Sequence, residues 1–254
     1  MALIVGTRIK IATAALVAVL GLCGPAAAGE VQFGLYGGWS GSFDSDATFK
    51  RGNSDFTLHS IPWEGLSFDY QGGAPYYGIR GTYWLNSTTA PTPKWGIMLD
   101  YTHAKVRAEG SAKVKATGTY MGKPAPNQMK ISNTFSRFEF TDGLNLLTLN
   151  AVRQLPSLGV VHPYLGGGLG IARPHVEVTG PGFPKTFEYQ VTGLAAQILA
   201  GVDVPLTEHF SIFSEYKLSY AGVDADLSKG GHLNTNVWTN HILVGASLRF
   251  GSGS

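Results

Sequence analysis

Eight segments of this chain alternate apolar and polar residues with a period of two, and this pattern limits the fold more than any other feature. In the last segment every second residue is apolar: Ile242, Val244, Ala246, Leu248 and Phe250. Such alternation predicts a strand with one apolar face. The sequence lacks the several apolar runs of about 20 residues that a helical membrane protein needs. The eight segments cover residues 31–39, 77–83, 95–101, 147–151, 165–171, 197–204, 210–220 and 241–250.

An even number of such strands predicts an all-β protein, an eight-stranded antiparallel transmembrane β-barrel of the outer-membrane type with long extracellular loops. A soluble eight-stranded barrel would instead turn its apolar face inward. Aromatic residues near the ends of segments, such as Trp39 and Trp95, favour the membrane form. A final aromatic residue is the signal that outer-membrane barrels present to their assembly machinery. We therefore expect Phe250 to bind that machinery.

The lengths of the connections predict the orientation of the barrel. Four are long, at residues 40–74, 105–143, 173–193 and 221–240, and they alternate with three short ones at 85–94, 155–162 and 205–209. Membrane barrels keep short turns in the periplasm and long loops outside the cell. Both termini are therefore expected to be periplasmic, and residues 29–250 to form one barrel domain in the cell outer membrane.

The two ends of the chain are expected to lie outside the barrel. Arg8 and Lys10 precede an apolar run at 11–22 and three alanines at 26–28, which is the order of a secretory signal peptide. The apolar run is too short to cross a bilayer. Residues 1–28 are therefore predicted to be a signal peptide, and residues 251–254, Gly-Ser-Gly-Ser, to be a linker-like tail.

Charged residues fall on the inward side of several predicted strands. An eight-stranded barrel is just wide enough for side chains to fill it, and buried charges must pair. The expected result is a structural plug, with a proton path or small pore as the alternative. A closed barrel has no free edge, so a monomer is expected. The predicted plug pairs Arg80, Lys217 and Arg249 with Asp100, Asp203 and Glu215.

Composition and motifs exclude several classes of function. Charged residues make up 14% of the chain and the formal net charge is +2, which argues against binding of nucleic acid. The sequence has no G-x-S-x-G, H-E-x-x-H or P-loop motif. The glycine run at 165–170 lies inside a predicted strand with no helix after it, which indicates close packing. No flavin or nicotinamide cofactor is expected.

Four polar residues lie near the outer ends of successive predicted strands: His103, Asp142, His175 and Glu177. Two histidines with a carboxylate suit a divalent transition metal and form the ligand set of non-haem iron oxygenases. The sequence therefore suggests a metal site made by His103, Asp142 and His175. The alternative is that these are solvated loop side chains.

The same strand ends carry a resemblance to a known family. THAKV (102–106), FTDGLN (140–145), PHVEV (174–178) and TFEYQ (186–190) resemble segments of the lipid A oxidases of rhizobia and related alphaproteobacteria. The resemblance implies oxidation of the proximal glucosamine of lipid A to 2-aminogluconate. Dioxygen would be the oxidant and hydrogen peroxide the by-product. Because dioxygen reacts slowly with closed-shell sugars, such chemistry also favours a metal cofactor.

We assign further roles by inference from these segments. Glu177 or Glu188 is the candidate proton acceptor, and Lys105, Arg173 and Tyr189 are candidates for binding lipid A, the two cations through a phosphate. The alternative function is an opacity-type adhesin or a purely structural barrel. The adhesin alternative is supported by the long second loop, which carries Lys113, Lys115, Lys123 and Lys130.

Overall fold

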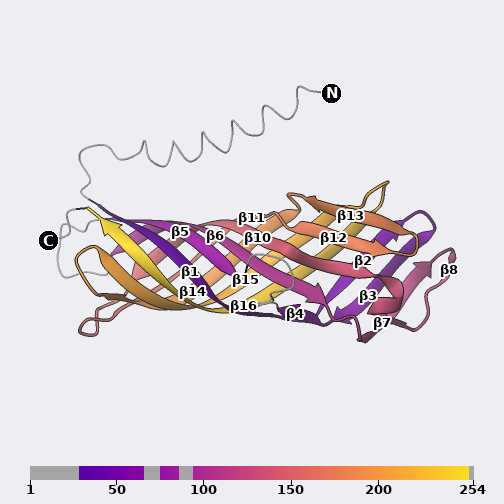
Figure 1. Cartoon of the computed structure of the whole chain (residues 1–254), viewed down its shortest axis with the longest axis horizontal. Helices are drawn as coiled ribbons and strands as arrows, with labels where there is room; N and C mark the ends of the chain where they lie inside the picture. The colour runs from indigo at the N-terminus through magenta and orange to yellow at the C-terminus, as the bar shows by residue number, and fades with distance from the viewer. Residues whose placement is uncertain (1–28, 66–74, 86–93, 252–254) are drawn as a thin grey trace, which may run out of the picture.

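The computed structural model describes residues 29–65, 75–85 and 94–251, and eight of the strands within them form a closed antiparallel ring (Figure 1). The last of these strands returns to the first, with Val31 opposite Phe250. This confirms the predicted eight-stranded barrel. The predicted signal peptide and residues 252–254 of the tail lie outside the described residues. The ring runs β1 (Glu30–Ser42), β5 (Tyr77–Trp84), β6 (Trp95–Ala108), β10 (Arg137–Gln154), β11 (His162–Ala172), β14 (Gly193–Pro205), β15 (Phe210–Asp226) and β16 (His232–Phe250).

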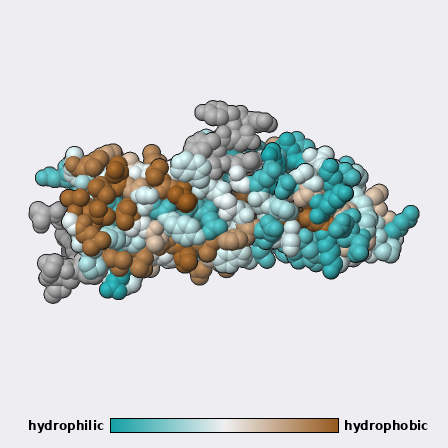
Figure 2. Space-filling view, turned by 90° about the horizontal axis from the view of Figure 1, so that it is seen from below, coloured by the Kyte–Doolittle hydropathy of each residue, from teal (hydrophilic) through white to brown (hydrophobic). Residues whose placement is uncertain are grey.

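The apolar face of the barrel strands points outward. Leu35, Ile198 and Ile242 are each about 60% exposed on the outer surface. Figure 2 shows hydrophobic residues gathered over the half of the molecule that carries the termini, and hydrophilic residues over the other half. A soluble barrel would bury these side chains, whereas lipid replaces water around them in a membrane. The polarity therefore matches the membrane form.

Charged side chains line the inside of the barrel, as the alternation predicted. Each cation of the predicted plug has an acidic partner, so the buried charges are neutralised in pairs. The pairs are Arg80–Glu215 at 2.6 Å, Lys217–Asp100 at 2.5 Å, and Arg249–Asp203.

The long connections form a second folded layer rather than open loops, and we call this part the cap. Its core is a group of packed aromatic rings, among them Phe49 and Phe135 with ring centroids 4.4 Å apart. Burial of these rings stabilises strands that the connection lengths alone do not reveal. No helix in the described ranges is long and apolar enough to cross a membrane. Besides the outer ends of β10, β15 and β16, the cap contains β2 (Ser45–Arg51), β3 (Ser54–Ile61), β4 (Trp63–Gly65), β7 (Lys113–Tyr120), β8 (Lys123–Pro124), β9 (Gln128–Lys130), α2 (Ile131–Thr134), β12 (His175–Gly180) and β13 (Phe183–Tyr189).

Candidate functional site

An irregularity in β10 marks the place where the barrel meets the cap. The register between β10 and β6 shifts between Phe140 and Leu144. Gly143 has a φ of 126°, a conformation that L side chains rarely adopt. Bulges of this kind re-aim side chains and occur often beside active sites. Here the bulge turns Asp142 toward the neighbouring strand β12.

The bulge brings three of the predicted residues together. One ligand atom from each of Asp142, His175 and Glu177 lies within 4.8 Å of the others. His175 Nδ1 is 3.2 Å from Glu177 Oε1 and 3.5 Å from Asp142 Oδ2. Their neighbours Val176 and Val178 are buried in the cap core, and side chains alternate along a strand. The three-residue group therefore faces outward, on the wall of the molecule.

Glu177 is the most enclosed member of this group. Its side chain is fully buried and accepts hydrogen bonds from the Asp142 backbone N–H at 2.9 Å and from Arg137 Nη1 at 2.5 Å. Burial by itself raises the pKa of Glu177, but the Asp142 N–H, His175 and Arg137 outweigh burial and hold the pKa below its usual value. Glu177 is thus a positioned carboxylate whose oxygens already accept hydrogen bonds from the protein. Asp142, with 42% of its side chain exposed, is the carboxylate that a ligand can reach.

Aromatic rings and cations surround His175. The ring packs against Phe187 and Tyr189, with centroid distances of 4.4 and 4.6 Å. The Tyr189 hydroxyl donates a 2.7 Å hydrogen bond to the Asp142 carbonyl and so fixes the bulge. The Arg173 guanidinium lies 4.8 Å above the Tyr189 ring, and the Lys185 ammonium 4.1 Å above the Phe187 ring. The structure therefore places Arg173 and Tyr189 beside the three-residue group.

His103 lies near this group but outside it. Its Nδ1 is 2.8 Å from Asn145 Oδ1, an oxygen that also accepts a hydrogen bond from the Tyr101 hydroxyl. Nδ1 must then carry the proton, and Nε2 holds a free lone pair; Nε2 is buried and has no hydrogen-bond partner among the described residues. Lys105, also buried, follows two positions later on the same strand.

Glu188 is separated from the other candidates. It pairs with Val176 across the strands, whereas Phe187 and Tyr189 pair with Glu177 and His175. Adjacent side chains point to opposite faces of a strand, so Glu188 faces away from the three-residue group. It is exposed and accepts a hydrogen bond from Gln190 Nε2 at 3.1 Å.

The donor set fits a divalent metal ion. Imidazole nitrogen suits zinc and iron, and carboxylate oxygen suits manganese and magnesium, so one histidine with two carboxylates suits an ion with mixed preference such as Mn²⁺. Beside the group, the buried Nε2 of His103 has no partner among the described residues and is free to accept a hydrogen bond from a bound molecule. The structure favours Glu177 over His103 as the third ligand. Arg137, Glu139 and Asn145 complete the surroundings, and the sequence pattern did not single them out.

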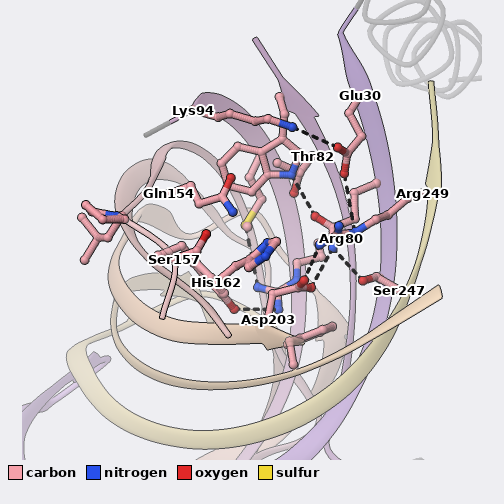
Figure 3. Close-up of a pocket in the computed structure, with 18 residues that line it drawn as sticks. Glu30, Arg80, Thr82, Lys94, Gln154, Ser157, His162, Asp203, Ser247 and Arg249 are labelled. Atoms are coloured by element: carbon pink, nitrogen blue, oxygen red, sulfur yellow. Dashed lines mark hydrogen bonds and ion pairs between the residues drawn. The ribbon is translucent and has the colours of Figure 1, made fainter. Parts of the chain in front are cut away.

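A cavity lies inside the barrel, away from the three-residue group, at the end that carries the termini. It is a cavity of about 550 Å³, lined by residues that include Lys94, His162 and Arg249 (Figure 3). Its charges are already paired, as in the contact of Lys94 Nζ with Glu30 Oε2 at 3.3 Å. At its inner end Arg80 is held by Glu215. This cavity therefore offers less available chemistry than the group on the outer wall.

Comparison with known proteins identifies the family. The sequence matches the outer membrane protein beta-barrel domain over residues 14–250. The chain belongs to this family. Its location is accordingly the outer membrane. No curated protein matches the sequence.

Solved structures of small outer-membrane barrels are similar to the chain. Neisserial surface protein A is 16% identical, with 88% of this chain and 97% of that chain covered and a TM-score of 0.42. The N-terminal barrel domain of Pseudomonas aeruginosa OprF is 15% identical, with coverage of 88% and 99% and a TM-score of 0.37. Outer membrane protein AlkL is 13% identical, with coverage of 89% and 92% and a TM-score of 0.44.

Proposed function

We propose that this outer-membrane protein is an enzyme that oxidises the proximal glucosamine of lipid A, with its cap outside the cell and its termini in the periplasm. The observation that carries the proposal is the group of Asp142, His175 and Glu177. The group begins a few residues after the exposed apolar side chains of Leu169 and Ile171 on the outer surface of β11. A lipid whose acyl chains cover that surface would place its sugar headgroup at this height.

The proposed reaction is a two-electron oxidation. The C1 hemiacetal of the glucosamine loses two electrons and two protons to dioxygen, which becomes hydrogen peroxide. The resulting lactone is opened by water to 2-aminogluconate, a net gain of one oxygen atom. A divalent transition metal held by Asp142, His175 and Glu177 would supply the redox chemistry that dioxygen requires.

The chain's own residues bind and orient the substrate. Arg173 lies at the edge of the group, above the Tyr189 ring, and is suited to hold a phosphate of the lipid, while the Tyr189 hydroxyl holds the bulge through its hydrogen bond to the Asp142 carbonyl. His103 Nε2 has a free lone pair and is the proposed proton acceptor. It takes this role from Glu177, whose carboxylate oxygens already accept hydrogen bonds from Arg137 and from the Asp142 N–H, and from Glu188, which faces away.

Mass spectrometry of lipid A tests the proposal. Cells with the protein, grown in air, are expected to show lipid A heavier by one oxygen atom, and cells without the protein or without dioxygen are not. His175→Ala should abolish the change, whereas Glu188→Ala should retain it as the matched control. Unmodified lipid A in cells with a folded, outer-membrane barrel would refute the enzyme.

A binding function is the second candidate, and the cap favours it at one place. Lys113 lies directly opposite Lys130 on neighbouring strands, an arrangement of like charges that is destabilising without an anion. Their neighbours Val114 and Met129 are buried, so both lysines face outward. If the protein is an adhesin, changing both lysines to glutamate should abolish attachment to host cells while His175→Ala leaves it intact.

A further inference from the structure

We propose that Arg137 is a built-in counter-ion for the site, which holds Glu177 in the ion-free protein and releases it when a divalent cation binds. Arg137 then turns to its second partner, Glu139. This inference rests on the metal centre of the proposed function and adds a means of regulating how the centre is filled.

The first step is the burial of Glu177. A buried carboxylate without a charged partner is strongly destabilising, so Glu177 needs a cation in every state of the protein. In the structure this cation is Arg137, whose Nη1 lies 2.5 Å from Glu177 Oε2. A metal ion bound to the same carboxylate would also neutralise its negative charge. Arg137 and the ion are therefore alternatives for one carboxylate.

The second step is that Arg137 has a second ion-pair partner, Glu139. The same Nη1 lies 3.1 Å from Glu139 Oε1, and 46% of the Arg137 side chain is exposed. Glu139 and Glu177 stand opposite each other on β10 and β12. The guanidinium can therefore leave Glu177 without losing all ionic contact and without crossing a packed core.

The third step is the balance of charge among the groups in direct contact. Asp142, Glu139 and Glu177 carry three negative charges when ionised, and Arg137 carries one positive charge; Arg107, which lies opposite Glu139 on β6, is already ion-paired with Glu64. One divalent ion neutralises the remainder. A monovalent ion would leave one charge unbalanced and is too weak a competitor for the arginine. The arrangement therefore selects for divalent ions.

Titration with Mn²⁺ tests the proposal on the purified, folded barrel, with the electron paramagnetic resonance signal of free Mn²⁺ as the measure of binding. Arg137→Gln is expected to lower the Kd about tenfold, because the ion no longer competes with the arginine. Glu139→Gln is expected to raise the Kd several-fold, because the displaced arginine loses its second partner. Lys185→Gln, which removes a cation from the same wall, is the control and should leave the Kd within twofold.

The double variant Arg137→Gln/Glu139→Gln separates this mechanism from simple electrostatics. Once Arg137 is absent, loss of Glu139 should have no further effect, so the double variant should bind like Arg137→Gln. Additive effects of the two changes would overturn the proposal, as would an unchanged or weaker affinity in folded Arg137→Gln. If Arg137→Gln does not fold, Arg137→Lys takes its place, with a smaller decrease in Kd expected.

Different results refute the counter-ion mechanism and the proposed oxidase. If the Arg137→Gln, Glu139→Gln and double variants bind Mn²⁺ with the expected affinities but lipid A is unmodified, the oxidase is refuted and the counter-ion mechanism is supported. Absence of Mn²⁺ binding by the wild-type barrel refutes the counter-ion mechanism, whatever the lipid A shows.

Discussion

Replacing Lys217 by methionine should destabilise the barrel strongly, because it leaves a charge alone in the barrel interior. Lys217 and Asp100 are both fully buried, with Nζ and Oδ2 2.5 Å apart. Asp100 would keep hydrogen bonds from the Tyr36 hydroxyl at 2.9 Å and Gln197 Nε2 at 3.0 Å, but it would have no cation in direct contact among the residues that the structure describes. Removal of one partner of a buried pair costs about 3–5 kcal/mol.

Unfolding by urea in phospholipid vesicles, followed by tryptophan fluorescence, measures this cost. Asp100→Asn should also destabilise the barrel, since it removes the negative charge beside the Lys217 ammonium and leaves neutral acceptors such as the hydroxyls of Tyr36 and Thr102. The double variant Lys217→Met/Asp100→Asn should lose less stability than the sum of the two single changes. A loss below about 1 kcal/mol for Lys217→Met, or strictly additive effects, would refute the reasoning that the pair is a coupled unit.

Three further predictions concern the cap and the site. Phe49→Ala, in the aromatic core of the cap, should cost about 3–5 kcal/mol by creating a cavity and should expose the cap to proteases; unchanged proteolysis would contradict that core. The pKa of Glu177 is lower in the folded protein than in the unfolded chain. Ionised Glu177 therefore stabilises the fold fully at pH values above the pKa of the unfolded chain, and this stabilisation is lost as the pH falls through the pKa of the folded protein. The melting temperature of the wild type should therefore fall more steeply below about pH 5 than that of Glu177→Gln, and parallel curves would refute this. Gly143→Ala should weaken Mn²⁺ binding about tenfold, because a Cβ would lie 2.7 Å from the His103 ring in a strained backbone; Gly41→Ala, where a Cβ meets nothing within 4 Å, should bind normally.

The barrel was predictable because the alternation of apolar and polar residues that specifies it lies within each strand segment. A period of two places every second side chain on one face, so Leu35 and Ile242 could be assigned to the outer surface and Glu215 to the inner one. The pairing of inner charges followed from the cost of burying them alone. The cap was not predictable in the same way. Its strands are short and its core joins residues as distant as Phe49 and Phe135.

The candidate site was predictable in part. His175 and Asp142 were expected to meet because successive antiparallel strands bring their ends together, and the structure places them 3.5 Å apart. The exclusion of Glu188 depends on which face of β13 it occupies, and that is set by pairing with β12. Arg137 lies 40 positions before Glu177, and no local motif joins them. Only the pairing of β10 with β12 brings the two together.

The sequence by itself determined the barrel, its strand number, its apolar exterior and its charged interior, because these depend on alternation along each strand and on the lengths between strands. The tertiary structure decided the rest: the folded cap, the bulge at Gly143, and the replacement of His103 by Glu177 in the group with Asp142 and His175. These features depend on register between distant strands. A shift of one residue in the register moves every side chain of a strand to the opposite face. The composition of a strand does not specify its register with a distant strand.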